Sequence, residues 1–325
     1  MRTRKLGTTG AELTTVGLGT WAIGGPWDWG WGEQDDRQSL ATIQRALDLG
    51  VNWIDTAAVY GLGHAEEIVA QAIGGRREEI FLVTKCGQVW DAEGRVTANN
   101  EPDSIRRECD DSLRRLRTDH IDLYLIHWPD AKTPVEASWE AMVRLKEEGK
   151  VRHIGVSNFG QDLLERCERI HHVDALQPAL NLFDRKWESA VLPWCAEHGV
   201  GVITYGSIGY GLLSGRFTRG SLGRLAEGDW RRRYGVFQEP LFSKVLAYID
   251  RLRPLAERRG MDLLHLALAW VLTRPAVTSA IVGARRPDQI EDILRAGDVD
   301  LTAEELAEID AIYSEALGAE EIPEL

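Results

Sequence analysis

Cysteine, long apolar runs and an excess of basic charge are scarce or missing in this sequence, and each absence excludes a class of protein. The four cysteines, Cys86, Cys109, Cys167 and Cys195, lie far apart and form no CxxC pair. That spacing argues against a disulfide framework and against a zinc site. No stretch approaches the roughly 18 consecutive apolar residues of a membrane-spanning helix. We therefore expect reduced thiols and no membrane span.

The charge balance is acidic. Lys and Arg number 38 against 51 Asp and Glu, which gives a formal net charge of −13. Nucleic-acid binding needs a basic surface, so a nucleic acid is not an expected partner. The first residues, MRTRKLGTTG, have no apolar run after their charges, so no secretory signal is expected and the protein should be cytoplasmic. An anionic ligand would have to be held by local cationic groups.

What the sequence does contain is an alternation of short β-branched runs with amphipathic helical segments. The strand-like runs are TVGLGTWAIG near 15–24, NWIDTA at 52–57, IFLVTKC at 80–86, IDLYLIHW at 121–128, VRHIGVSN at 151–158, ALQPALN at 175–181, VGVITYGS at 200–207 and TSAIVGA at 278–284. Continuously apolar runs are typical of parallel strands covered on both faces. Eight strand–helix units predict a single α/β domain over residues 1–325, a (β/α)8 TIM barrel, with an open doubly wound sheet as the alternative.

Two segments depart from this alternation. Residues 208–241 are rich in Gly and Arg and have no helical or strand period, so a long functional loop is expected there. Residues 302–317 begin with Thr302 and Glu305 in the spacing of a capping box, which predicts a C-terminal helix. Helical segments elsewhere often stop at a glycine, which accepts a left-handed backbone at low cost. These glycines are Gly50, Gly74, Gly149 and Gly199.

The polar residues that end the runs are the candidates for chemistry, because barrels of this type form active sites at the carboxyl ends of their strands. Asp55, Tyr60, Lys85 and His127 end or follow three consecutive runs. Each alone has an ordinary structural explanation, but together they indicate a catalytic site. Asp55 would pair with Lys85, and the ammonium group would lower the pKa of the Tyr60 phenol. Tyr60 would then serve as a general acid.

This set favours protonation of an oxygen. His127 could donate a hydrogen bond to a carbonyl oxygen beside Tyr60, and no G-x-S-x-G motif supplies a nucleophile, so an external hydride is the expected reactant. A metal-dependent hydrolase is an alternative. The later runs, however, end in amides and hydroxyls where metal ligands would be needed, so no metal is expected.

A glycine-rich stretch near the start imitates a dinucleotide-binding motif. GLGTWA at 17–22 matches G-x-G-x-x-A, but Pro26 and the sequence WDWGWG follow where the helix of that motif should begin. The match therefore does not indicate a dinucleotide-binding motif at residues 17–22. Trp27, Trp29 and Trp31 in the same stretch are expected to line a pocket, since clustered tryptophans are rarely left exposed without a use.

The candidate for phosphate binding lies after the last run. IVGARRPDQIEDIL leads from a strand through a turn into a helix that begins near Pro287. Barrels of this type commonly bind phosphate at a helix N-terminus after the eighth strand. Arg285 and Arg286 add positive charge and bidentate hydrogen bonding.

Taken together, these motifs resemble the aldo-keto reductase family over nearly the whole chain. The matching segments are GLGTWAIGG, IDTAAVYG, VTK, IDLYLIHWPD, GKVRHIGVSNF, LQPALNLFDR, YGSIGYGLLSGRF and VGARRPDQIED. The sequence is similar to bacterial members of the general-stress and inositol-operon type and to the β-subunits of potassium channels. The resemblance implies NADPH-dependent reduction of aldehydes or ketones by hydride transfer, with a tetrad at Asp55, Tyr60, Lys85 and His127.

The resemblance also implies which residues contact the ligands. Ser157, Asn158 and Gln177 would hold the nicotinamide carboxamide, and Tyr205 would stack on the ring. The other implied cofactor contacts are Thr20, Trp21, Asp55, Ser207, Ile208, Leu212, Arg216, Gly283, Arg285, Gln289 and Asp292. Arg285 would face the adenosine 2′-phosphate. The implied substrate pocket consists of Trp27, Trp29 and Trp128.

Two classes of function follow from this reading. The first is an enzyme acting on a small-molecule carbonyl compound. The second is a regulatory binding protein that senses its cofactor and turns over slowly, like the channel subunits. Turnover on a panel of carbonyl compounds separates the two classes.

Overall fold

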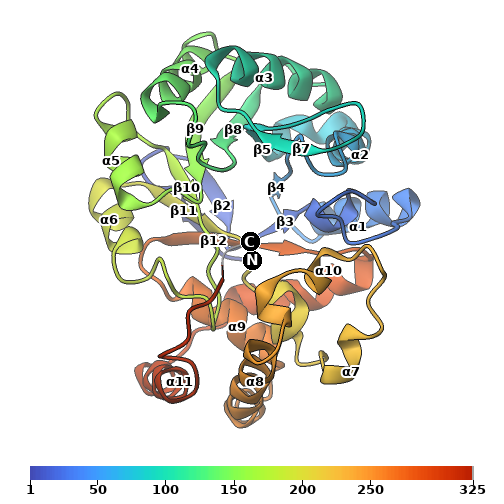
Figure 1. Ribbon diagram of the computed structural model, residues 1–325, viewed down its shortest axis with the longest axis vertical. Coiled ribbons are helices and arrows are strands. Elements are labelled where there is room, and N and C mark those ends of the chain that lie inside the picture. Colours follow the sequence, from blue (N-terminus) through green and yellow to red (C-terminus); the bar gives the residue numbers. More distant parts are fainter. Residues whose placement is uncertain (324–325) are drawn as a thin grey trace.

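The computed structural model describes residues 1–323. Eight parallel strands close into a barrel at the centre of the molecule (Figure 1). In order around the barrel they are β3 (Val16–Gly19), β4 (Trp53–Asp55), β5 (Phe81–Cys86), β8 (Ile121–Ile126), β9 (Val151–Ser157), β10 (Ala175–Gln177), β11 (Gly201–Thr204) and β12 (Val277–Gly283). The ring closes where β12 pairs with β3, with Ala280 opposite Val16. The expected (β/α)8 barrel is confirmed.

Helices surround the barrel (Figure 1). They are α1 (Asp36–Asp48), α2 (His64–Ile73), α3 (Pro102–Leu116), α4 (Val135–Glu147), α5 (Gln161–Glu168), α6 (Val191–His198), α7 (Arg219–Leu222), α8 (Leu241–Arg258), α9 (Leu263–Leu272), α10 (Pro287–Leu294) and α11 (Ala303–Ala316). The connection from β11 to β12 is the longest, because it carries α7, α8 and α9. Helix α8 was not expected from the sequence.

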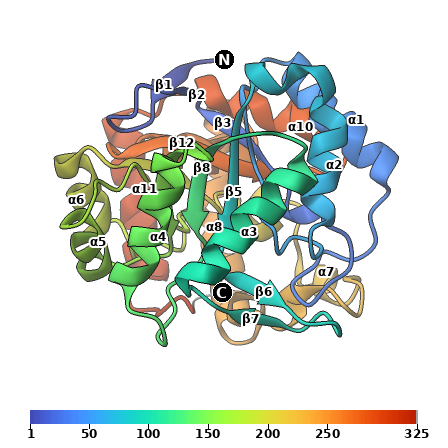
Figure 2. The same cartoon turned by 90° about the horizontal axis from the view of Figure 1, so that it is seen from above.

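Two antiparallel hairpins lie at opposite ends of the barrel (Figure 2). One consists of β1 (Thr3–Lys5) and β2 (Glu12–Thr14), and the other of β6 (Gln88–Trp90) and β7 (Val96–Ala98). Leu6 and Leu13 of the first hairpin are fully buried with Trp53, Val83 and Leu123 from the strands. The first hairpin therefore closes one end of the barrel and leaves the carboxyl ends of the strands for the site.

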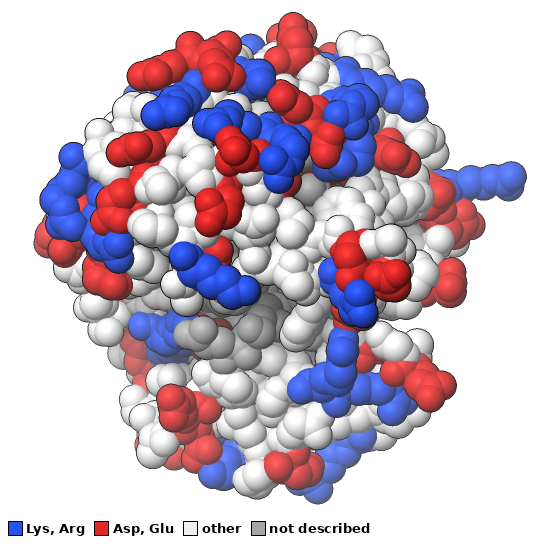
Figure 3. Space-filling view, turned by 45° about the horizontal axis from the view of Figure 1, so that its top comes forward, with Lys and Arg blue, Asp and Glu red and all other residues white. Residues whose placement is uncertain are grey.

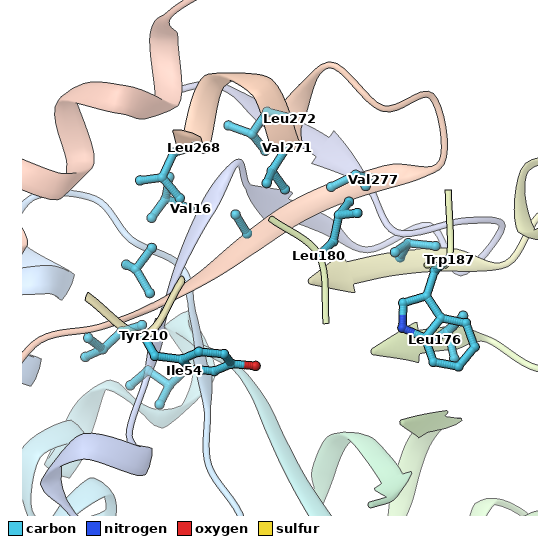
Figure 4. Close-up of a cluster of buried hydrophobic side chains, with 14 of the residues drawn as sticks. Val16, Ile54, Leu176, Leu180, Trp187, Tyr210, Leu268, Val271, Leu272 and Val277 are labelled. Carbon is cyan, nitrogen blue, oxygen red and sulfur yellow. The ribbon is translucent and has the colours of Figure 1, made fainter. Parts of the chain in front are cut away.

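The larger part of the core lies between the strands and the helices. Figure 4 shows a portion of this layer, in which Leu268 of α9 lies beside Val16 of β3 and Leu272 lies near Val277 of β12. These strand residues face outward, while Trp53, Val83 and Leu123 face the interior of the barrel. Strands with both faces buried account for the continuously apolar runs in the sequence.

The expected helix-ending glycines and the expected capping box are confirmed. Gly50, Gly74, Gly149 and Gly199 all have positive φ at the ends of helices. Helix α11 begins with the capping box, in which Glu305 N donates to Thr302 Oγ1 and Thr302 N donates to Glu305 Oε2.

The strands are shorter than their apolar runs. The run at 15–24 contributes only Val16–Gly19, because a single 3₁₀ turn, Trp21–Ile23, follows it.

Residues 208–241 form a loop with short helical turns. The turns are Gly209–Ser214, Arg219–Leu222, Trp230–Arg232 and Gly235–Phe237. Across the described residues, no helix has both the length and the apolar character needed to cross a membrane. All four cysteines are buried free thiols.

Candidate active site

A lysine at the end of β5 is the centre of the candidate site. Lys85 Nζ donates to Asp55 Oδ1 at 2.8 Å, to Thr56 O at 2.8 Å and to Tyr60 OH at 3.2 Å. Asp55 Oδ2 accepts from Gln177 Nε2 at 2.7 Å. Lys85 and Asp55 are only 1% and 3% exposed. The expected pairing of Asp55 with Lys85 beside Tyr60 is present.

The strand register explains why these side chains meet. Side chains two residues apart on a strand share a face. Trp53 and Val83 point into the barrel, so Asp55 and Lys85, each two residues later, point the same way nearer the carboxyl end. Leu125 of β8 also faces inward, which places His127 on the same side. The rings of Tyr60 and His127 are 5.8 Å apart between centroids.

Burial controls the protonation of this cluster. It raises the pKa of Tyr60 well above its ordinary value, and Asp55 adds to that rise. It also raises the pKa of Asp55 and lowers that of Lys85, each against the attraction of the other. Burial and Lys85 together hold the pKa of His127 well below its ordinary value. The lowered pKa expected for Tyr60 is not found, because desolvation of the phenolate outweighs the favourable effect of the Lys85 ammonium.

A cavity of about 260 Å³ opens above Tyr60 and His127. Aromatic side chains make most of its wall, and Gln88 of β6 adds an amide. Its lining residues are Trp21, Trp27, Trp29, Val59, Tyr60, Gln88, His127, Trp128, Ser157, Asn158, Gln177 and Tyr205. We call this space the Trp-lined cavity. The three tryptophans expected to form a substrate pocket all border it, and Gln88 is a wall residue that the sequence did not indicate.

A second cavity, of about 190 Å³, adjoins the first. The two share Trp21, Tyr60 and Tyr205 as wall residues. The other lining residues of the second cavity are Gly19, Ala22, Trp31, Asp55, Gly206, Ser207, Ile208, Tyr210, Gly211, Ile281, Gly283, Arg285 and Gln289. This space, called the trough below, extends from the Lys85 cluster to the turn before α10.

Most of the residues implied as cofactor contacts border one of these two spaces. Thr20, Leu212, Arg216 and Asp292 do not. Leu212 is fully buried in the core. Arg216 is 79% exposed, with Nη2 3.7 Å from Asp292 Oδ2. Thr20 is buried with its hydroxyl unpartnered, while its backbone N donates to Asp55 O.

Hydrogen bonds fix the polar groups at the junction of the two spaces. Tyr205 OH donates to Asn158 Oδ1 at 2.8 Å, and Asn158 Nδ2 donates to Ser157 Oγ at 3.0 Å. Ser157 Oγ in turn donates to Gln177 O at 2.8 Å. The backbone of Asn158 has φ 63, in the left-handed region that residues other than glycine adopt uncommonly. These bonds hold the polar groups of the wall in fixed positions.

The trough is covered by aromatic side chains from two loops. Trp230 is fully buried, and its ring centroid lies 4.8 Å from that of Trp21 and 5.6 Å from that of Trp31. The guanidinium of Arg231 lies 4.5 Å from the Trp31 ring. None of residues 217–241 borders the Trp-lined cavity. An isolated tryptophan in a Gly- and Arg-rich loop was the available signal for this cover.

Arg285 was expected to face a phosphate. It borders the trough, but each of its guanidinium nitrogens donates to residues 31–34 of the loop before α1. Arg286 is paired with Asp288. Among residues 1–323, no three His, Cys, Asp or Glu side chains are grouped to hold a metal ion.

Known proteins share this architecture. The model of the aldo/keto reductase family matches residues 15–314. The chain is 38% identical to aldo-keto reductase YhdN of Bacillus subtilis over 95% of this chain and 93% of that protein. It is 35% identical to the NADH-specific methylglyoxal reductase of Escherichia coli, covering 93% and 95% of the two chains.

Two further similarities come from a plant protein and a solved structure. The probable voltage-gated potassium channel subunit beta of Arabidopsis thaliana is 31% identical over 92% of each chain. The glycerol dehydrogenase of Gluconobacter oxydans superposes with a TM-score of 0.89 at 38% identity, covering 99% of this chain and 98% of the other. Fold, site geometry and full-length similarity agree, and the chain belongs to the aldo/keto reductase family of oxidoreductases.

Proposed function

We propose that the protein reduces aldehydes or ketones to alcohols, with a nicotinamide dinucleotide in the trough and the carbonyl compound in the Trp-lined cavity. The observation that carries this proposal is the contact of Tyr60 OH with Lys85 Nζ at the junction of the two spaces. The dinucleotide supplies the hydride. Asp55, Tyr60, Lys85 and His127 are the proposed catalytic residues.

Tyr60 supplies the proton. Its raised pKa keeps the phenol protonated at neutral pH, which is the form that a reductase needs at the start of each turnover. The adjacent ammonium of Lys85 stabilises the phenolate left after the proton moves to the substrate oxygen. His127, whose lowered pKa keeps the imidazole neutral, donates a hydrogen bond to the same oxygen.

Tyr60→Phe tests this assignment. We expect the variant to bind the cofactor as the unsubstituted protein does and to lose about 10²–10⁴-fold in kcat, the usual contribution of general acid catalysis. Oxidation of the reduced dinucleotide during turnover of an aldehyde panel is the measurement. Tyr313→Phe, on α11, is the matched control and should keep full activity. A near-normal kcat in Tyr60→Phe would refute the role of Tyr60.

The proposed cofactor is NADPH. Arg285 borders the trough at the turn before α10, and a guanidinium can hold the 2′-phosphate through two hydrogen bonds. Basic and acidic side chains are interspersed over the face in Figure 3, so the phosphate must be recognised by a local group. The E. coli relative is named an NADH-specific methylglyoxal reductase, so the preference of this chain between NADPH and NADH has to be measured.

Arg285→Ala gives that measurement. We expect NADPH affinity to fall roughly ten- to a hundredfold, because hydrogen bonds to charged groups contribute about 1.5–3 kcal/mol each. NADH affinity should hardly change. Quenching of tryptophan fluorescence reports both titrations. Equal losses for the two dinucleotides would show that Arg285 supports the loop and does not read the phosphate.

A regulatory, cofactor-sensing protein is the second candidate, favoured by the similarity to the plant channel subunit. This function predicts tight dinucleotide binding with negligible turnover on every carbonyl compound, together with a stoichiometric partner. Rapid turnover without a partner would exclude it.

A further inference from the structure

Arg285 and Gln34 hold two loops together beside the trough. Arg285 Nε donates to Gln34 Oε1 at 2.5 Å, Nη1 donates to Trp31 O at 3.4 Å, and Nη2 donates to Glu33 O. Gln34 Nε2 donates back to Arg285 O at 3.1 Å. We call this set of contacts the Arg285–Gln34 clasp.

Both partners of the clasp are themselves fixed. Gln34 Nε2 also donates to Ser39 Oγ, a buried hydroxyl on α1, at 3.0 Å. Arg285 N donates to Gln289 Oε1 at 2.8 Å, which holds the turn before α10. Trp31 is packed against Trp230 in the aromatic cover. The clasp is therefore part of an ordered wall of the trough, because its members are anchored on α1, on α10 and on the cover.

The clasp occupies the groups that would grip a phosphate. A guanidinium binds a phosphate through two neighbouring nitrogens in one plane. All three guanidinium nitrogens of Arg285 already donate to the 31–34 loop. Nε has a single N–H, which is used by Gln34 Oε1, so a bidentate grip through Nε and a neighbouring Nη nitrogen must give up that bond. The neighbouring Arg286 is committed to Asp288 and does not replace it.

We propose that Gln34 sets the preference between NADPH and NADH by competing with the 2′-phosphate for the Arg285 guanidinium. This inference rests on the proposed function, since it assumes that the trough takes the dinucleotide. NADH has a neutral hydroxyl at the 2′ position and leaves the clasp closed. NADPH has a dianion there and draws the guanidinium away from Gln34, so the clasp lowers the affinity for NADPH alone.

Two substitutions at residue 34 give opposite results under this proposal. Gln34→Ala removes the competing acceptor and should tighten NADPH about tenfold, the value of one hydrogen bond to a charged group. Gln34→Glu places a carboxylate against the guanidinium and should weaken NADPH about tenfold or more by the same reasoning. NADH affinity should change by less than about twofold in both variants, a small fraction of one such bond. Fluorescence titration of each dinucleotide is the measurement.

Gln38→Ala is the matched control, because Gln38 is an exposed glutamine on α1, one turn further along the chain. It should leave both affinities unchanged. Equal loosening of NADPH and NADH by Gln34→Ala, in a variant with the normal melting temperature, would overturn the proposal and make the clasp a purely structural tie. Failure of the unsubstituted protein to bind either dinucleotide would instead overturn the proposed function.

Discussion

Lys85 shows how a single side chain can hold the chemistry of a site together. Its ammonium reaches a carboxylate, a carbonyl oxygen and a phenol from a position that is almost completely buried. A buried charge is tolerated only when its partners replace the water that it has lost. Asp55 and Thr56 provide that replacement, and the contact with Tyr60 gives the ion pair a chemical use.

Lys85→Met should therefore damage both activity and stability. Asp55 would be left as an unpaired buried carboxylate, which typically costs 3–5 kcal/mol of unfolding free energy. The double variant Asp55→Asn with Lys85→Met removes both charges and should recover most of that stability without recovering kcat. Urea unfolding and single-turnover reduction separate the two effects. Recovery of kcat in the double variant would mean that the ammonium has no part in the chemistry.

At the scale of elements, the strand register did most of the positioning. The expectation that Asp55, Lys85 and His127 converge depended only on their positions at the ends of runs that proved to be neighbouring strands. That part of the site could be predicted from the sequence, because barrel strands are parallel and their side chains alternate between the two faces of the sheet. The hydrogen bond between Arg285 and Gln34 could not be predicted from the sequence, since it joins residues 251 positions apart in two irregular loops.

The missed elements have similar explanations. Helix α8 buries Phe242, Val245, Ile249 and Leu252 at helical spacing, but it follows directly on the aperiodic loop and contains Pro254. The hairpins at the two ends of the barrel have strands of only three residues each, too short for a periodic signal. The (β/α)8 pattern, by contrast, is repeated eight times in the chain, and errors at single boundaries did not obscure it.

Helix α11 gives a prediction at this scale. Thr302→Ala removes the side-chain acceptor for Glu305 N and should lower the unfolding free energy by about 1 kcal/mol, the typical value of an N-cap. Thr302→Ser keeps the hydroxyl and should cost little. Denaturant unfolding is the measurement. Equal stability of the alanine and serine variants would show that the reciprocal bond from Thr302 N to Glu305 is sufficient.

At the scale of the whole molecule, one buried acid should influence how stability changes with pH. Glu108 of α3 accepts from Gly87 N at 2.9 Å and from Ser104 Oγ at 3.0 Å. Burial raises its pKa from 4.5 to about 7 in spite of these bonds. The folded pKa is the higher one, so the stabilising contribution is complete below pH 4.5 and is lost as pH rises through about 7.

Glu108→Gln should flatten this pH dependence. The loss of unfolding free energy between pH 5 and pH 8 should be smaller in the variant by about 2–3 kcal/mol, from a shift of that size at 1.36 kcal/mol per pKa unit. Glu257→Gln, an exposed position on α8, is the control and should leave the pH dependence as it is. Denaturant titrations at the two pH values test this, and an unchanged slope in Glu108→Gln would contradict it.

The burial of the four thiols should make the folded protein resistant to oxidation at its cysteines. Burial raises the pKa of Cys109, Cys167 and Cys195 to about 12 and that of Cys86 well above its ordinary value. Oxidants and alkylating agents attack the thiolate, and the folded chain offers almost none. Damage at these positions therefore requires the fold to open first. Because Cys86 adjoins Lys85 on β5 while the others lie on α3, α5 and α6, the order in which they are modified would record which part of the barrel opens first.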